Sequence, residues 1–89
     1  AAITDHEPPD ARRALAERIM TGLRLAEGLD INPILAAVSL AAAERLHRTA
    51  SRYRASGHLL ESPSRWRLSD SGFLIADCIA ADFMAALDD

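Results

Sequence analysis

Histidine, cysteine and serine are the side chains of this sequence that could carry out catalysis, and their spacing forms no recognisable catalytic site. The histidines His6, His47 and His58 are far apart along the chain, and no serine or cysteine lies in a nucleophile motif. Cys78 is the only cysteine, so the chain has no partner for an internal disulfide and too few thiolates for an iron–sulfur cluster. We therefore expect no catalytic residue and no metal site, and the lone thiol favours a reducing, cytoplasmic setting.

Arginine offers a different chemistry, because its guanidinium group binds phosphates and carboxylates. All ten basic residues are arginines, and six of them lie within residues 44–67 against two glutamates. Residues 68–89 carry five aspartates and no basic residue, and the net charge of the chain is −3. Helical spacing groups Arg45, Arg48 and Arg52 on one face, and Arg65 and Arg67 follow in a short extended segment.

A nucleic-acid interface is one interpretation of these five arginines, but two observations weigh against it. The helix predicted over residues 40–56 contains no asparagine or glutamine that could read adenine. Glu44 and Arg48 also form an ordinary i,i+4 pair, and solvated arginine faces are common on surface helices. Nucleic-acid binding therefore remains the alternative function, and DNA is not the partner that we favour.

Proline and apolar spacing predict the elements of the first half of the chain. A helix begins near Pro8 or Pro9, because proline is tolerated in a first helical turn, and apolar residues recur at every fourth position. Gly22 weakens that helix, and residues 23–25 alternate apolar, charged and apolar, which favours a very short strand. Asp30 is placed to cap a short helix that continues to Val38. The apolar stripe of the first helix consists of Ala11, Leu15, Ile19 and Leu23.

The second half of the chain predicts a long helix, a hairpin and a final helix. Ser39 caps a helix over residues 40–56, and Gly57 ends it. Residues 58–68 are typical of a β-hairpin with its turn at 62–65, and Trp66 lies on its apolar face. Ser69 caps a last helix that runs to the end of the chain. The apolar positions expected on the two helices are Leu40, Ala43, Leu46, Ala50 and Tyr53, and Phe73, Ala76, Ile79 or Ala80, Phe83 and Leu87.

This order of elements predicts a mainly α-helical fold with a small β-hairpin, arranged as a winged-helix-like single domain. We expect the domain to span residues 8–89, with residues 1–7 as a flexible lead-in. No run of 18 apolar residues could cross a membrane. The expected core consists of Leu15, Ile19, Leu23, Leu46, Tyr53, Leu68, Phe73, Ile79 and Phe83.

Two segments resemble a known protein family. Residues 18–30, RIMTGLRLAEGLD, resemble the (L/I)M-x-GLRL-x-EG-(I/L/V)-D segment of the C-terminal domain of oxygen-independent coproporphyrinogen III oxidase-like proteins. Residues 57–60 and 66–74 resemble the end of that domain, G-(L/Y)-L followed by (W/L)-x-(I/L)-T-x-x-G-x-L, with Ser69 in place of the usual threonine. The resemblance covers about residues 8–84, and its GLRL form is most like the heme chaperone branch.

The resemblance implies a longer radical S-adenosylmethionine protein of which this chain is the C-terminal part. An N-terminal partial barrel would hold a [4Fe–4S] cluster on a C-x-x-x-C-x-x-C motif, and the present domain would pack beside it as a non-catalytic part. The oxidase branch decarboxylates porphyrinogen propionates, whereas the chaperone branch binds heme and passes it to acceptor proteins. The domain would then help to form or cover the porphyrin or heme site.

Three residues are candidates for contacts with that barrel or its ligand. Arg24 and Glu27 lie in the distinctive GLRL-x-EG segment, where they either bridge to the barrel or cap the turn at Gly28. Trp66 is expected mainly as a core residue over the last helix, although its ring could stack on a flat macrocycle. A domain separated from its barrel is also expected to expose an apolar patch and to dimerise through it.

Overall fold

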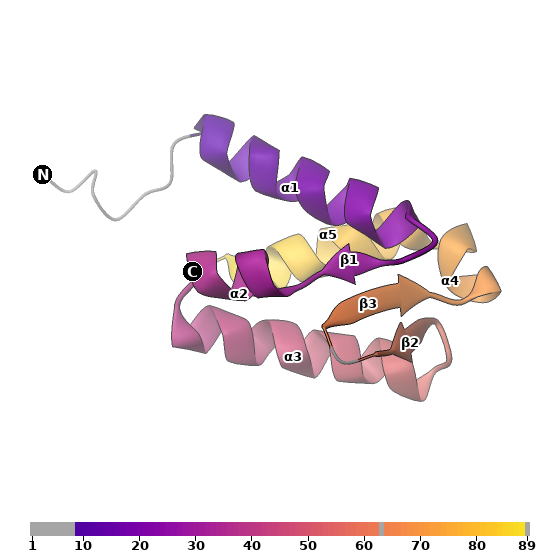
Figure 1. Cartoon of the computed structure of the whole chain (residues 1–89). Coiled ribbons are helices and arrows are strands. Elements are labelled where there is room, and N and C mark those ends of the chain that lie inside the picture. The colour runs from indigo at the N-terminus through magenta and orange to yellow at the C-terminus, as the bar shows by residue number, and fades with distance from the viewer. Residues whose placement is uncertain (1–8, 63, 89) are drawn as a thin grey trace, which may run out of the picture.

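Five helices and a small sheet make up the part of the chain that the computed structural model describes, residues 9–62 and 64–88. The predicted lead-in, residues 1–7, lies outside the described residues. In chain order the elements are α1 (Pro9–Arg24), β1 (Leu29–Asp30), α2 (Asn32–Ala37), α3 (Leu40–Ala55), β2 (Leu59–Glu61), β3 (Arg65–Leu68), α4 (Asp70–Leu74) and α5 (Ala76–Leu87) (Figure 1). The mainly α-helical class with a small antiparallel sheet is confirmed, and the order of elements is the one expected for a winged-helix-like domain.

The sheet holds β3 in its centre, with β1 on one side and β2 on the other. Both pairings are antiparallel, with Leu29 opposite Trp66 and Leu59 opposite Leu68. Trp66 and Leu68 point to the same side because side chains alternate along a strand, and both are buried. The two-stranded hairpin that was predicted is therefore present, and β1 adds a third strand to it.

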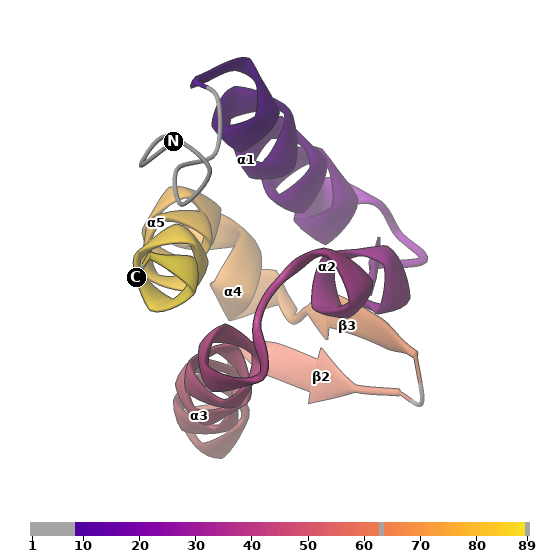
Figure 2. The ribbon, with the colours of Figure 1, turned by 90° about the vertical axis from the view of Figure 1, so that its left-hand side faces the viewer.

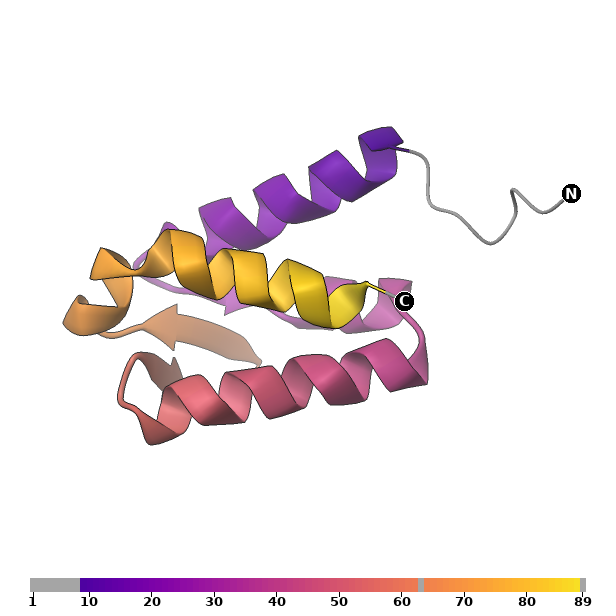
Figure 3. The same ribbon diagram turned by 180° about the vertical axis from the view of Figure 1, so that it is seen from behind.

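The core lies between the sheet and the three longer helices. Seen from behind, α5 lies between α1 and α3 on one side of the sheet (Figure 3). Six of the nine predicted core residues are buried, and Leu15 and Tyr53 are partly buried against them. The buried six are Ile19, Leu23, Leu46, Leu68, Ile79 and Phe83.

Capping side chains determine where several elements begin and end, as the sequence predicts. The hydroxyl groups of Ser39 and Ser69 accept hydrogen bonds from the backbone N–H groups of Ala42 and Gly72, each at 3.1 Å. Gly57 has a φ of +84°, the left-handed conformation that ends α3. At α2 the N-cap residue is Ile31, which has no side-chain cap, and not Asp30 as predicted; the Asp30 carboxylate, one residue earlier, accepts from the backbone N–H of Asn32 at 3.1 Å.

The predicted short strand over residues 23–25 is wrong. Leu23 and Arg24 belong to the last turn of α1, and the strand forms instead at Leu29–Asp30. The helix continues through Gly22 because this glycine lies directly against Leu29, so tertiary packing offsets the low helical propensity of glycine.

The predicted single final helix is also wrong, and so are two of the expected apolar positions, one on this helix and one on α3. The helix breaks at Ile75, which has a φ of −121° and a ψ of 28°, and this separates α4 from α5. The break turns Phe73 outward, where it is 44% exposed instead of buried in the core. Leu40, expected on the apolar face of α3, is 86% exposed because it begins the first turn, and Ala42 is buried instead.

No helix among the described residues is both long enough and apolar enough to span a bilayer.

Candidate functional site

A groove lies between α1 and the segment formed by β1 and the start of α2. Its volume is about 510 Å³. Figure 2 shows α1 on one side of this region, with α2 and the sheet on the other. We call it the α1–β1 groove, and its lining consists of Ala14, Glu17, Arg18, Thr21, Gly22, Leu25, Gly28, Leu29, Asp30, Pro33 and Arg65.

Two glycines give the α1–β1 groove its shape. A Cβ atom on Gly22 would overlap the Leu29 side chain and lie 3.2 Å from the Leu29 Cα, so α1 and β1 can meet only where a side chain is missing. Gly28 has a φ of +88°, and a Cβ atom there would lie 2.8 Å from the Trp66 carbonyl oxygen. The turn between α1 and β1 therefore runs directly over β3, and Leu25, in this turn, remains 45% exposed.

Charged side chains lie at the rim of the groove, above a floor of small and apolar residues. Arg65 is held by the Glu27 carboxylate at 3.7 Å and donates a hydrogen bond to the Gly28 carbonyl at 3.4 Å. Asp30 lies opposite Arg65 in the strand register, and both side chains line the groove together with Glu17 and Arg18 on α1. The rim thus offers both signs of charge to a partner.

A second hollow of about 400 Å³ adjoins the groove along α1. Ala14 and Arg18 line both hollows, and Ala11, Leu15 and Ala37 complete the second one. The α1 residues that line the two hollows run from Ala11 to Gly22, a rise of about 17 Å at 1.5 Å per residue. The two linings combine small and apolar residues with charged side chains, which suits contact with another protein segment.

Arg24 and Glu27 each have a partner within the domain and are not paired with each other. Arg24 lies 2.7 Å from the Asp77 carboxylate of α5, and the two side chains are 54% and 79% exposed. Glu27 pairs with Arg65, as described above. Because both pairs are open to solvent, either could also contact a second surface, and their role between domains stays a prediction.

Trp66 lies in the core and is 3% exposed. Its ring meets Phe83 edge-on at 5.5 Å and His47 at 5.8 Å between ring centroids, and the Arg54 guanidinium carbon lies 5.2 Å from the ring centroid. With aromatic contacts and a cation around it, the ring is positioned for packing inside the domain. This arrangement favours the core interpretation over stacking on a planar ligand.

The five arginines considered for nucleic-acid binding fall into two groups. Arg45, Arg48 and Arg52 surround a cleft of about 440 Å³ between α3 and the end of α5. Arg65 is paired at the rim of the α1–β1 groove, and the Arg67 side chain crosses Gly28 in the same region. The structure therefore does not bring the helix and hairpin arginines together into one continuous basic surface.

A polar cluster near the end of α3 looks like a nucleophile with a base, but its hydrogen bonds oppose that function. The Ser56 hydroxyl lies 2.7 Å from Nδ1 of His58, and it donates its proton to the Tyr53 carbonyl at 3.1 Å. A hydroxyl that donates to this carbonyl accepts from a protonated Nδ1 of His58, and in that arrangement the imidazole does not remove its proton. Among the described residues, no three histidine, cysteine or acidic side chains are grouped for a metal ion.

Tyr53 is the titratable group with the clearest perturbation. Burial, and then the hydrogen bond that its hydroxyl donates to the Asp82 carboxylate, raise the pKa of Tyr53 to about 12. A tyrosine held neutral in this way connects α3 to α5 and is not available as a base at neutral pH.

Sequence reasoning did not predict the α1–β1 groove, because a groove depends on the distance between elements far apart in the chain. The available signal was the pair of glycines, Gly22 and Gly28, that flank Leu25 within six residues of each other. Glycines at such spacing indicate close backbone approach.

Comparison with known proteins matches most of the chain to one family model. A family model described as the HemN C-terminal domain matches residues 10–75, which include the whole α1–β1 groove. Searches of curated proteins and of solved structures found no significant match.

Proposed function

Because the chain belongs to the HemN C-terminal domain family, we propose that it is the non-catalytic accessory domain of a radical S-adenosylmethionine protein of the oxygen-independent coproporphyrinogen III oxidase-like family. In this proposal the α1–β1 groove docks on the catalytic part of the parent protein, and the domain helps to form or cover the porphyrin or heme site. The GLRL form of residues 22–25 favours the heme chaperone branch.

One observation carries the proposal: the most distinctive segment of the chain lines the α1–β1 groove. Thr21, Gly22, Leu25 and Gly28 belong to the GLRL-x-EG segment and its flank, and all four line the groove. A packing role inside the domain would account for the buried glycines but not for Thr21 and Leu25, which are exposed. An exposed leucine beside an apolar hollow supports contact with another surface.

The iron–sulfur chemistry that the family implies does not fit this chain. A [4Fe–4S] cluster needs several thiolates, and the chain has Cys78 alone, on the exposed side of α5. We therefore assign the cluster and S-adenosylmethionine to the rest of the parent protein, and to this domain only contact and coverage. A cytoplasmic location is part of the proposal, since an exposed thiol and an iron–sulfur protein both suit a reducing compartment.

Arg24 and Glu27 are proposed as contacts at the edge of the docking surface. Arg24 is the last residue of α1, and Glu27 lies in the turn that follows it. The ion pairs that they form within the domain are exposed enough to be shared with a partner. Exposed pairs contribute little to stability, about 0–1 kcal/mol, so their exchange for contacts across an interface costs little.

The experiment is association of the chain with the rest of its parent protein, produced separately and mixed, measured by calorimetry. Leu25→Glu and Thr21→Arg should each weaken the association at least about tenfold, because each places a charge in a buried contact at a cost of more than 1.4 kcal/mol. Leu40→Glu is the matched control, since Leu40 is 86% exposed on α3, outside the groove, and it should leave the association unchanged.

Loss of coproporphyrinogen turnover or of heme transfer in the same groove variants of the full-length parent would support coverage of the site. Docking through the groove would be contradicted if the Leu25→Glu variant associated normally with the rest of the parent protein, or if Leu40→Glu weakened this association as much as the groove variants do.

A further inference from the structure

The cleft between α3 and the end of α5 is not used by the proposed docking, and it has the form of an anion-binding site. Its volume is about 440 Å³, and it is lined by Arg45, Arg48, Thr49, Arg52 and Ala86. Thr49 and Ala86 are buried and short, which leaves the space open between the helices. Three guanidinium groups thus surround one hollow.

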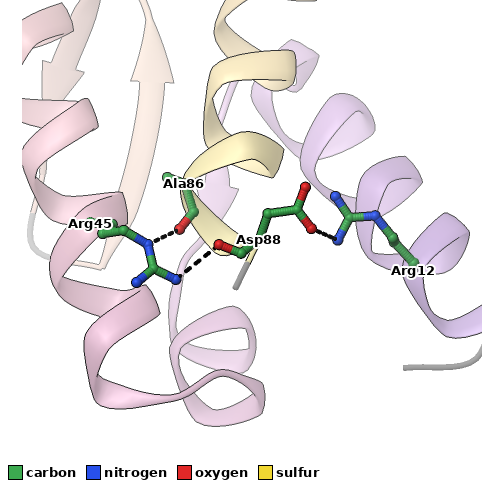
Figure 4. Close-up of polar contacts among 4 residues, drawn as sticks. All are labelled: Arg12, Arg45, Ala86 and Asp88. Atoms are coloured by element: carbon green, nitrogen blue, oxygen red, sulfur yellow. Dashed lines mark hydrogen bonds and ion pairs between the residues drawn. The ribbon is translucent and has the colours of Figure 1, made fainter. Parts of the chain in front are cut away.

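Arg45 forms the closed end of this cleft. Its Nε donates to the Ala86 carbonyl at 2.8 Å, and one of its terminal nitrogens donates to the Asp88 carbonyl at 3.1 Å (Figure 4). These bonds join α3 to the last turn of α5 and satisfy carbonyl groups that a helix end leaves without partners. These bonds hold the Arg45 side chain in place at one side of the cleft, so we do not assign it as the group that binds an anion there.

The carboxylates nearest to the cleft on α5 are bound elsewhere. The Asp88 carboxylate turns toward α1 and pairs with Arg12 at 2.9 Å, as Figure 4 shows. The Asp82 carboxylate accepts the hydrogen bond from the Tyr53 hydroxyl. On α3 itself, Glu44 lies one turn before Arg48, but no ion pair joins the two within the described residues.

Arg48 and Arg52 consequently face the cleft with their charge uncompensated. Neither has an ion pair or a side-chain hydrogen bond among the described residues, and both are exposed. They are four residues apart on α3, so their backbones are separated by about 6 Å along the helix axis. Guanidinium groups at that spacing match two carboxylates one helical turn apart on a partner helix.

We infer that this cleft binds an acidic protein segment, with Arg48 and Arg52 each pairing with one of two carboxylates spaced four residues apart. A nucleic-acid strand fits the site less well, because the basic surface does not continue to the hairpin, where Arg65 pairs with Glu27 and faces Asp30. The inference stands independently of the docking groove, which lies between α1 and β1.

The test is a fluorescence anisotropy titration of the chain with a labelled alanine-based helical peptide that carries two glutamates four residues apart. The same peptide with glutamines is the uncharged control, and a short single-stranded DNA is the nucleic-acid probe. Arg48→Gln and Arg52→Gln should each weaken binding of the glutamate peptide about threefold, which is within the range for exposed ion pairs. Arg13→Gln, an exposed arginine on α1, is the matched charge control and should leave binding unchanged.

Binding should weaken with added salt, because exposed charges are screened. Three results would overturn the inference. Arg13→Gln could weaken binding of the glutamate peptide as much as the cleft variants do, which would indicate diffuse attraction, or the glutamine peptide could bind as tightly as the glutamate peptide. The DNA could also bind more tightly than the glutamate peptide and depend on Arg48 and Arg52, which would assign the cleft to nucleic acid. Absence of binding at peptide concentrations of about 1 mM would also overturn it. Thermal melts of each variant, expected to match the unmodified chain, exclude loss of folding as the cause.

Discussion

Gly22 lies against Leu29 with no side chain between them, and this contact determines how closely α1 approaches β1. A Cβ atom at position 22 would lie 3.2 Å from the Leu29 Cα and would overlap the Leu29 side chain. The contact joins the last turns of α1 to the sheet and forms the floor of the α1–β1 groove. The same residue pair thus determines both local packing and the shape of the candidate docking surface.

Gly22→Ala should lower the free energy of unfolding by about 1–2 kcal/mol, because the added methyl group overpacks the contact with Leu29. Replacement of glycine by alanine inside a helix normally stabilises a protein by about 0.5–1 kcal/mol, so the expected sign is opposite to the ordinary one. Urea denaturation followed by circular dichroism measures the effect. Thr21→Ala, at the neighbouring exposed position, controls for helical propensity; a stabilised Gly22→Ala variant would contradict the close contact.

Arg45 should contribute more to stability than the ion pair between Arg12 and Asp88. Arg45→Ala removes two charge-assisted hydrogen bonds to backbone carbonyls at the end of α5, an expected loss of about 1–3 kcal/mol. Asp88→Ala removes only a pair whose side chains are 39% and 62% exposed, and it leaves the backbone acceptors of Arg45 in place. Its expected loss is about 0–1 kcal/mol. Equal losses of stability for Arg45→Ala and Asp88→Ala in thermal melts would contradict this expectation.

Tyr53 should make stability depend on pH in the alkaline range. Its folded pKa of about 12 lies above its ordinary value of about 10, so its contribution is complete below pH 10 and is lost as the pH rises through 12. The chain has a single tyrosine, so the ultraviolet absorbance of tyrosinate reports this residue alone.

In Asp82→Asn the Tyr53 pKa should fall only part of the way toward 10, because burial, the larger cause, remains. In Tyr53→Phe the loss of stability between pH 10 and pH 12 should disappear. A tyrosine that titrates near pH 10 in the folded, unmodified chain would contradict both the burial of Tyr53 and its bond to Asp82.

The isolated chain should self-associate weakly through exposed apolar side chains near the end of α1. Leu25, Phe73 and Leu74 are 45%, 44% and 86% exposed. The ion pair between Arg24 and Asp77 joins the end of α1 to the start of α5. Figure 1 and Figure 3 both place α4 at the same end of the molecule as the end of α1. Sedimentation velocity should detect a dimer that Leu74→Glu weakens. A chain that remains monomeric at all concentrations would remove this surface as an interface.

Local signals predicted most of the fold because they act over a few residues. Ser39, Ser69 and Gly57 mark helix ends through side-chain caps and a left-handed backbone, which any sequence displays directly. The errors occurred where distant contacts decide the structure. Leu23 and Arg24 stay helical because Gly22 packs on Leu29, and Phe73 is exposed because the chain bends at Ile75 to let α5 align between α1 and α3.

The candidate site was predictable only in part, for the same reason. Helical spacing correctly placed Arg45, Arg48 and Arg52 on one face of α3. It could not indicate that Arg45 binds the end of α5, 41 residues away, or that Arg65 pairs with Glu27. These partners follow from the packing of α5 and of the sheet, which no local pattern specifies.

Radical footprinting of the full-length parent protein tests the docking claim most directly, because it reports the exposure of individual side chains. The isolated chain should be labelled at both Leu25 and Leu40, which are 45% and 86% exposed. In the parent protein, labelling of Leu25 and of Pro33, also in the groove, should fall several-fold, while labelling of Leu40 stays the same. Unchanged labelling of Leu25 together with protection of Leu40 would place the interface on α3 and contradict docking through the α1–β1 groove.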